Sequence, residues 1–199
     1  MDRVDVDRPE TSGRYHHGNL RATMLRIAEE LIAGAGPVKL SLREVARRAG
    51  VSHAAAAHHF GTKGGLLTAL AADGLRDLAG RLAAARSRGF LEVGVAYVTF
   101  SVDRPGAFAV MFDRDVVRPD DPELLAARHE AGRALHGEVG TILPEGADAL
   151  SGAVAAWALV HGLSSLLRGG MIPPGLPDDA AELTRAVAVH LASARRADR

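Results

Sequence analysis

The segment from Ser41 to Phe60 constrains the fold more strongly than any other part of the sequence. Ser41 is followed three residues later by Glu44, which is the spacing of a capping box and predicts that a helix begins here. Gly50 is placed to end this helix, and Ser52 to cap a second one that runs to Phe60. Two helices this short have to stabilise each other by packing, so the segment predicts a helix-turn-helix.

The small side chains within this segment indicate that its two helices cross closely. Ala46 lies in the middle of the first helix, where a larger side chain would push the second helix away. Gly50 can take the positive φ that a sharp turn needs. The apolar positions beneath the pair are Val45, Ala49, Val51, Ala56 and Phe60. An ordinary αα-hairpin with no role in DNA binding is the alternative that this pattern leaves open.

The distribution of charge favours a nucleic-acid-binding role for the N-terminal part of the chain. The formal net charge of the 199 residues is zero, but residues 14–68 carry eight lysines and arginines against three acids. They also hold five of the nine histidines. A basic module of this kind attracts the phosphate backbone of DNA, with chance variation in surface charge as the alternative.

Outside the helix-turn-helix, apolar residues recur at helical spacing. Helices are predicted over residues 18–35, 63–86, 90–102, 105–112, 122–143, 147–168 and 178–194. No sustained alternation typical of strands occurs, so we predict an all-α fold. Residues 1–13 are polar and aperiodic, and we expect a disordered tail there. The predicted domains are a three-helix helix-turn-helix domain at 14–68 and a larger helical domain at 69–199.

The first turns of the second helix of a helix-turn-helix enter the major groove. The candidate base contacts in this chain are therefore Ser52, His53, Ala54 and Ala55. Alanine methyl groups can contact thymine methyls, while serine and histidine can hydrogen-bond base edges. For His53, His58 and His59, contact with phosphates or full solvation is the alternative.

Three stretches of the N-terminal part together resemble a known family. They are YHHGNL at 15–20, SLREVARRAGVS at 41–52 and HFGTK at 59–63. With them, residues 14–70 resemble the N-terminal domain of the TetR family of transcriptional repressors. The resemblance implies a bacterial regulator of nine or ten helices, in which three form the DNA-binding domain and the others dimerise and bind a ligand. It also implies that His53, Ala54 and Ala55 contact bases, and that Arg43, His59 and Lys63 contact phosphates.

Ala57 departs from the family pattern, which usually has an aromatic residue, most often tyrosine, at this position. That tyrosine typically contacts a phosphate, so its absence predicts weaker binding or compensation by His58. A helix-turn-helix that no longer binds DNA is the alternative. The presence of His59 and Lys63 at the expected positions argues against this alternative. The segment Arg14–His17 is either an arm that reaches an adjacent backbone or minor groove, or a partly ordered N-cap segment.

The C-terminal part carries most of the large side chains of the chain. A pocket for a small apolar or aromatic ligand is one interpretation of this set, and core packing is the other. The segment WALVHG at 157–162 resembles a C-terminal domain of some TetR-like regulators, marked by a tryptophan followed by His-Gly. The candidate ligand-binding residues are Tyr97, Phe100, Phe108, Met111, Phe112, Trp157 and His161.

The resemblance also implies a homodimer. In the family the last two helices, here residues 147–168 and 178–194, pack against their symmetry mates as a four-helix bundle. Small residues in the first of these, such as Gly152, Ala155 and Gly162, suit close helix contact. Such a dimer would bind a near-palindromic double-stranded DNA operator with its recognition helices about 34–36 Å apart.

Several function classes are disfavoured by what the sequence lacks. It has no cysteine, no G-x-S-x-G motif and no phosphate-binding glycine loop, and its histidine pairs do not converge on one point. We therefore expect no enzyme, no metal and no cofactor. No membrane span or signal peptide is expected, which favours a cytoplasmic protein. The predicted function is a ligand-responsive transcriptional regulator, most simply a repressor, with a DNA-binding activator or architectural protein without a ligand as the alternative.

Overall fold

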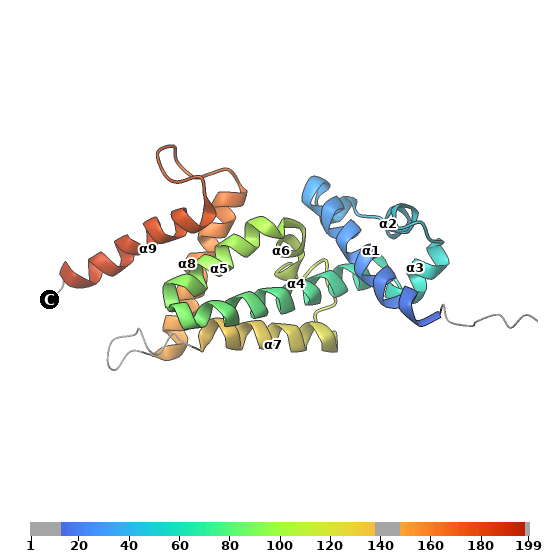
Figure 1. The fold of residues 1–199 in the computed structure, drawn as a ribbon, viewed down its shortest axis with the longest axis horizontal. Coiled ribbons are helices and arrows are strands. Elements are labelled where there is room, and N and C mark those ends of the chain that lie inside the picture. The colour runs from blue at the N-terminus through green and yellow to red at the C-terminus, as the bar shows by residue number, and fades with distance from the viewer. Residues whose placement is uncertain (1–12, 138–147, 198–199) are drawn as a thin grey trace, which may run out of the picture.

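The structure is a computed structural model that describes residues 13–137 and 148–197 (Figure 1). Its elements, in order, are α1 (Gly13–Ala35), the 3-10 turn η1 (Pro37–Lys39), α2 (Leu42–Arg48), α3 (His53–Phe60), α4 (Lys63–Ala85), the 3-10 turn η2 (Arg86–Arg88), α5 (Phe90–Asp103), α6 (Pro105–Met111), α7 (Pro122–His136), α8 (Ala149–Arg168) and α9 (Ala180–Ala197). The described residues contain helices and no strand, so the predicted all-α fold is confirmed.

Helices α1, α2 and α3 form a small bundle at one end of the molecule (Figure 1). Its core is apolar and buried, which is what holds these helices together. The residues that make this core are Met24, Ile27, Ala28, Val45, Ala46, Ala56 and Phe60. The bundle therefore presents α3 on a fixed frame.

Helix α4 leaves this bundle and becomes the central helix of the larger domain. It runs for 23 residues and packs against α5, α6 and α7, lying beside α7 for much of its length (Figure 1). Helices α8 and α9 pack on α5 at the far end of the molecule (Figure 1). The same helix thus contributes to the helix-turn-helix domain and to the larger domain.

The two domains also meet where α1 packs against α6. A Cβ atom at Gly106 would overlap the backbone carbonyl of Glu29, so the two helices approach as closely as a glycine allows. Beside this contact, Arg104 pairs with Glu29 of α1 and with Asp73 and Asp77 of α4. An ionic cluster and a close backbone contact therefore fix the orientation of α1 on the larger domain.

The helix bounds agree with the predicted ranges to within three residues except at two places. Helix α1 begins at Gly13 rather than at residue 18, so residues 14–17 are helical. The helix predicted over 122–143 is described as α7 as far as His136, and residues 138–147 lie outside the described residues. The predicted tail also lies outside them, apart from Gly13.

The capping box predicted at Ser41 is wrong. The side chain of Ser41 makes no capping hydrogen bond to α2. Glu44, the residue that would complete the box, accepts hydrogen bonds from Arg47 and Arg48 instead. Two arginines within one helical turn of Glu44 offer its carboxylate stronger partners than a backbone N–H does, which explains the difference.

Helix α8 bears on the expectation that the chain has no membrane span. By length and composition alone, Ala149–Arg168 could cross a membrane, with a mean hydropathy of 1.5. This is weak evidence, because an apolar helix of a protein–protein interface meets the same criterion. In this fold α8 packs on α5 with one side and exposes the other.

Candidate DNA-binding surface and ligand cavity

The turn between α2 and α3 has the geometry that the sequence predicts. Gly50 takes a φ of 71°, and the backbone N–H of Val51 donates to the carbonyl of Ala46 at 3.0 Å to close the turn. Helices α2 and α3 pack together, and Ala46 of the first and Ala56 of the second are both buried in the common core. Small residues at the crossing and a glycine in the turn therefore produce the helix-turn-helix.

The N-terminal end of α3 points its side chains away from the core. Ser52 caps the helix as predicted, since its hydroxyl oxygen accepts from the N–H of Ala55 at 3.1 Å. Ser52, His53 and Ala54 are exposed, and Ala55 is partly buried. The exposed residues project no long side chain except that of His53, so this end of α3 can approach another surface closely.

The basic residues of α2 flank this surface. Arg43 is exposed, while Arg47 and Arg48 share the carboxylate of Glu44 at 2.7 and 2.8 Å. These hydrogen bonds, that of Arg47 first, lower the pKa of Glu44 to about 2. Glu44 therefore stays ionised at all physiological pH values, and the three arginines keep an excess of positive charge on the helix.

The second half of α3 carries His58 and His59. His58 is exposed, and His59 is partly buried with its ring centroid 6.2 Å from that of Phe60. Ala57, at the position where the family usually has an aromatic residue, is partly buried and adds no polar group. His58 is the exposed polar side chain next to that position.

Lys63 begins α4, where the sequence analysis placed a phosphate contact. Thr62 caps the helix by accepting from the N–H of Gly65 at 3.2 Å. Lys63 is partly buried, and its Nζ donates to the carbonyl of Val38 in η1 at 2.6 Å. The ammonium group is therefore held beside the first turn of α4, whose free backbone N–H groups also favour an anion.

The loop between α6 and α7 also contacts the start of α4. The guanidinium of Arg118 donates to Thr62 Oγ1 at 2.9 Å, and the backbone N–H of Arg118 donates to Thr68 Oγ1 at 2.9 Å. Phe112, at the other end of this loop, lines a cavity in the larger domain. A short segment of chain therefore connects that cavity with the start of α4.

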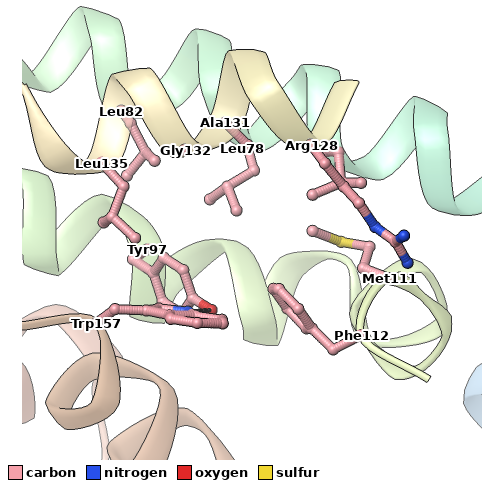
Figure 2. A pocket seen from close by; sticks show the side chains of 11 residues that line it. Leu78, Leu82, Tyr97, Met111, Phe112, Arg128, Ala131, Gly132, Leu135 and Trp157 are labelled. Carbon is pink, nitrogen blue, oxygen red and sulfur yellow. Dashed lines mark hydrogen bonds between the residues drawn. The ribbon is translucent and has the colours of Figure 1, made fainter. Parts of the chain in front are cut away.

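This cavity of about 260 Å³ has α4 and α7 on one side and residues of α5, α8 and the end of α6 on the other (Figure 2). Its surface is apolar apart from a few side-chain atoms, and one charged residue, Arg128, contributes to it (Figure 2). The lining residues are Leu75, Leu78, Leu82, Tyr97, Met111, Phe112, Arg128, Ala131, Gly132, Leu135 and Trp157. The volume and the apolar walls suit a small organic molecule.

The polar groups of Tyr97 and Trp157 are engaged with each other and with His161. The indole Nε1–H of Trp157 donates to the Tyr97 hydroxyl oxygen at 3.1 Å. An indole can only donate, so the Tyr97 hydroxyl is free to donate its own hydrogen to Nδ1 of His161, 2.9 Å away. Burial raises the pKa of Tyr97 and lowers the pKa of His161, which keeps both groups neutral.

Four of the seven predicted ligand-binding residues line the cavity, namely Tyr97, Met111, Phe112 and Trp157. Phe100, Phe108 and His161 do not. Phe100 and Phe108 are buried in the core, and His161 stacks on Phe108 with ring centroids 5.4 Å apart. These three residues support the cavity wall, which corresponds to the core-packing interpretation of them.

The sequence analysis missed the contribution of α4 and α7 to the cavity. Leu75, Leu78 and Leu82 follow helical spacing on α4 and were not distinguishable from core residues. Arg128 did carry a signal, because it interrupts an apolar stripe that continues through Leu124 and Ala131 of the same helix. The candidate set was chosen from large apolar side chains and one histidine, so it did not include this arginine.

Two family models together match most of the chain. Residues 23–70 match a model described as bacterial regulatory proteins of the tetR family, and residues 90–191 match a tetracyclin repressor-like C-terminal domain. No curated protein matches the chain.

Solved structures share this fold over most of their length. A protein of unknown function from Rhodococcus sp. RHA1 has 32% sequence identity and a TM-score of 0.72, covering 90% of this chain and 96% of that one. PfmR, a TetR family transcriptional regulator from Thermus thermophilus, has 20% identity and a TM-score of 0.64, covering 82% and 93%. SmeT, solved in complex with triclosan, has 20% identity and a TM-score of 0.53, covering 85% and 91%.

Proposed function

Because the chain belongs to the TetR family of bacterial regulatory proteins, we propose that it is a ligand-responsive repressor that binds its operator as a homodimer. Membership in this family makes it a DNA-binding transcriptional regulator and not an enzyme. The observation that carries the finer proposal is that one helix, α4, both begins at the DNA-binding surface and forms a wall of an apolar cavity.

The proposed DNA contacts are the exposed N-terminal end of α3 for bases and its basic surroundings for phosphates. His53, Ala54 and Ser52 contact base edges and thymine methyls, with Ala55 behind them. The proposed phosphate contacts are Arg43, His58, His59 and Lys63. With small side chains on α3, much of the affinity comes from the phosphate contacts, so binding depends steeply on salt.

Release by a ligand is the second part of the proposal. A molecule in the cavity would contact α4 directly and would also contact Phe112, from which the loop leads to Arg118 and its hydrogen bond to Thr62. A ligand that binds more tightly to one position of this loop and of α4 shifts the equilibrium between DNA-binding and released states. SmeT, which has this fold, is solved with a small molecule. An activator or architectural protein without a ligand is the alternative.

The operator is expected to be near-palindromic, because a two-fold symmetric dimer presents two identical α3 helices. Selection of bound sequences from a random DNA pool tests this directly. Two half-sites in inverted orientation, with centres about one helical turn apart, are the expected outcome. Enrichment of a single half-site, or of no sequence at all, would contradict the proposed mode of binding.

Lys63→Ala is expected to weaken binding to specific and non-specific DNA alike. Loss of one phosphate contact should lower the slope of log K against log salt by about one. Lys63→Arg should retain most of the affinity, which separates loss of the charge from loss of the hydrogen bond to Val38. Arg133→Ala, on the exposed side of α7, removes the same charge elsewhere and should leave the slope unchanged. An unchanged slope for Lys63→Ala would remove this residue from the DNA interface.

The proposed dimer interface is the exposed side of α8 together with α9. Leu150, Val154 and Leu166 of α8 are 69%, 50% and 45% exposed, and no charged residue lies between Ala149 and Leu167. A continuous apolar helix face of this kind is typical of a protein–protein interface. This also gives a reason other than a membrane for the apolar composition of α8.

Val154→Arg is expected to convert the dimer into a monomer, because a buried unpaired guanidinium in an apolar interface is costly. Sedimentation at micromolar concentration should show this change, with a parallel loss of operator affinity. Ala126→Arg on the exposed side of α7 is the matched control and should remain dimeric. A wild-type protein that sediments as a monomer would refute the proposed dimer.

A further inference from the structure

Arg128 is the one charged side chain among the described residues that line the cavity. It lies on α7, is partly buried, and stands at one end of the cavity, opposite Leu135, Tyr97 and Trp157 (Figure 2). Its guanidinium group lies close to Met111, at the side of the cavity where α6 ends (Figure 2). The cavity therefore has an apolar end and an end with a single positive charge.

Arg128 has no acidic partner among the described residues. The positions three and four residues away on α7 are Leu124, Leu125, Ala131 and Gly132, which cannot form an ion pair. Glu123, an acid on the same helix, forms ion pairs with Arg21 and Arg76 at 3.5 and 3.4 Å. A guanidinium group with no acid beside it keeps its N–H donors and its charge available to a ligand.

The other side-chain polar groups at the cavity wall already have partners. The hydroxyl of Tyr97 and the indole N–H of Trp157 bond to each other, and the hydroxyl is within hydrogen-bond distance of His161 as well. A ligand that enters the cavity therefore meets apolar surface at one end and a five-donor cation at the other. Among the described residues of the cavity wall there is no acid that could hold a cation and no second base that could hold a second negative charge.

We propose that the cavity binds a monoanionic organic acid, with its carboxylate paired to Arg128 and its apolar body against Tyr97 and Trp157. This inference rests on the proposed function, in which the cavity holds the regulatory ligand. Arginine presents two parallel N–H groups to a carboxylate, so the pair would fix the direction of the ligand as well as its charge. A neutral molecule of the same shape would lack the charge-assisted hydrogen bonds that a carboxylate forms with the guanidinium.

The test compares acids with amides of the same shape. The probes are 4-phenylbutyrate with 4-phenylbutyramide, and decanoate with decanamide. Trp157 is the only tryptophan of the chain and lies in the cavity wall, so its fluorescence reports occupancy directly. Affinities are then measured by calorimetry on the full-length protein. We expect each acid to bind about 10- to 100-fold more tightly than its amide.

Three variants assign this preference to Arg128. Arg128→Met keeps the length of the side chain and should abolish the preference for the acid while the amide still binds. Arg128→Lys should keep part of it, since the charge remains but the paired donors are lost. Arg133→Met, on the exposed side of the same helix, should behave as wild type. Retention of the preference in Arg128→Met would overturn the assignment.

Failure of this inference can be told apart from failure of the proposed function. If acid and amide change Trp157 fluorescence at equal concentrations, the anion preference is refuted and a ligand cavity stands. If no probe binds at millimolar concentration, the anion inference is overturned, and ligand-dependent release loses its support. Operator selection and the Lys63 variants still decide the DNA-binding part on their own.

Discussion

Gly65→Ala is expected to destabilise the protein by about 2–4 kcal/mol and to abolish operator binding. A Cβ atom at Gly65 would overlap the carbonyl oxygen of Phe60, and it would lie 3.1 Å from the carbonyl carbon. Both atoms belong to the backbone at the end of α3, so no side-chain rotation can relieve the contact. The overlap can therefore be relieved only by a movement of α3 relative to α4, which displaces the proposed DNA-binding surface.

The neighbouring Gly64→Ala is a matched control for this prediction. Its Cβ atom would meet Thr62 Oγ1 at 3.6 Å, an ordinary contact, and alanine favours helix over glycine by about 0.5–1 kcal/mol. Urea and thermal unfolding should thus give a lower stability for Gly65→Ala and an equal or higher one for Gly64→Ala. In melting temperature the first change is about 5–15 °C. Equal stability of the two variants would show that the α3–α4 junction relaxes freely.

The sequence was sufficient for the helix-turn-helix because that unit is specified by local signals. Gly50 in the turn, Ser52 as a cap and the small residues Ala46 and Ala56 act over a few neighbouring positions, and the structure places each of them as expected. Ser41 shows where local reasoning fails. A capping box would require the Glu44 carboxylate to accept a hydrogen bond from the backbone N–H of Ser41. Arg47 and Arg48 donate to that carboxylate instead.

The cavity could be predicted only in part because its walls come from helices far apart in the sequence. Aromatic residues suggested Tyr97, Phe112 and Trp157, since large rings stand out in a chain that is 4% aromatic. Which side of α4 and of α7 turns toward them is set by how the helices pack, and periodicity cannot distinguish a cavity wall from a core. Likewise, the position of Arg128 in the cavity wall follows from how α7 packs on the other helices and cannot be read from its neighbours in the sequence.

The junction between the domains was not visible in the sequence at all. Arg104 reaches Glu29, Asp73 and Asp77, residues that lie between 27 and 75 positions away along the chain. Each of them alone is an ordinary charged residue on a helix. Only the crossing of α1, α4 and α6 brings them together, and no local pattern encodes that crossing.

Arg104→Met is the second substitution for which a large effect is expected. The guanidinium of Arg104 lies 2.5 Å from Glu29, 3.0 Å from Asp73 and 3.2 Å from Asp77, and the side chains of Arg104 and Glu29 are only 20% and 16% exposed. Burial lowers the pKa of Arg104, but hydrogen bonds and charge from Glu29 and Asp73 outweigh it and raise the pKa, so Arg104 is always charged. Its removal takes this cation away from Glu29 and Asp73 at the joint between the domains, while Asp77 keeps its ion pair with Arg81.

The expected cost of Arg104→Met is about 2–4 kcal/mol, toward the low end of what breaking a buried ion pair costs, because Asp73 and Asp77 retain some solvent. Urea unfolding measures it. Arg26→Met provides the contrast, since it breaks an ion pair with Glu30 whose side chains are 63% and 56% exposed and should cost less than about 0.5 kcal/mol.

The pair with Glu29 carries the link between the domains, and a double-mutant cycle isolates it. Glu29→Gln alone leaves Arg104 with Asp73 and Asp77, so it should cost less than Arg104→Met. Once Arg104 is removed, the Glu29 carboxylate has already lost this ion pair, so neutralising it costs little more. The destabilisation of the double variant should therefore be smaller than the sum of the destabilisations of the two single variants. Additive costs would mean that Arg104 stabilises the larger domain through Asp73 and Asp77 alone. The orientation of α1 would then depend on its close backbone contact with Gly106, and Gly106→Ala would be the substitution that separates the domains.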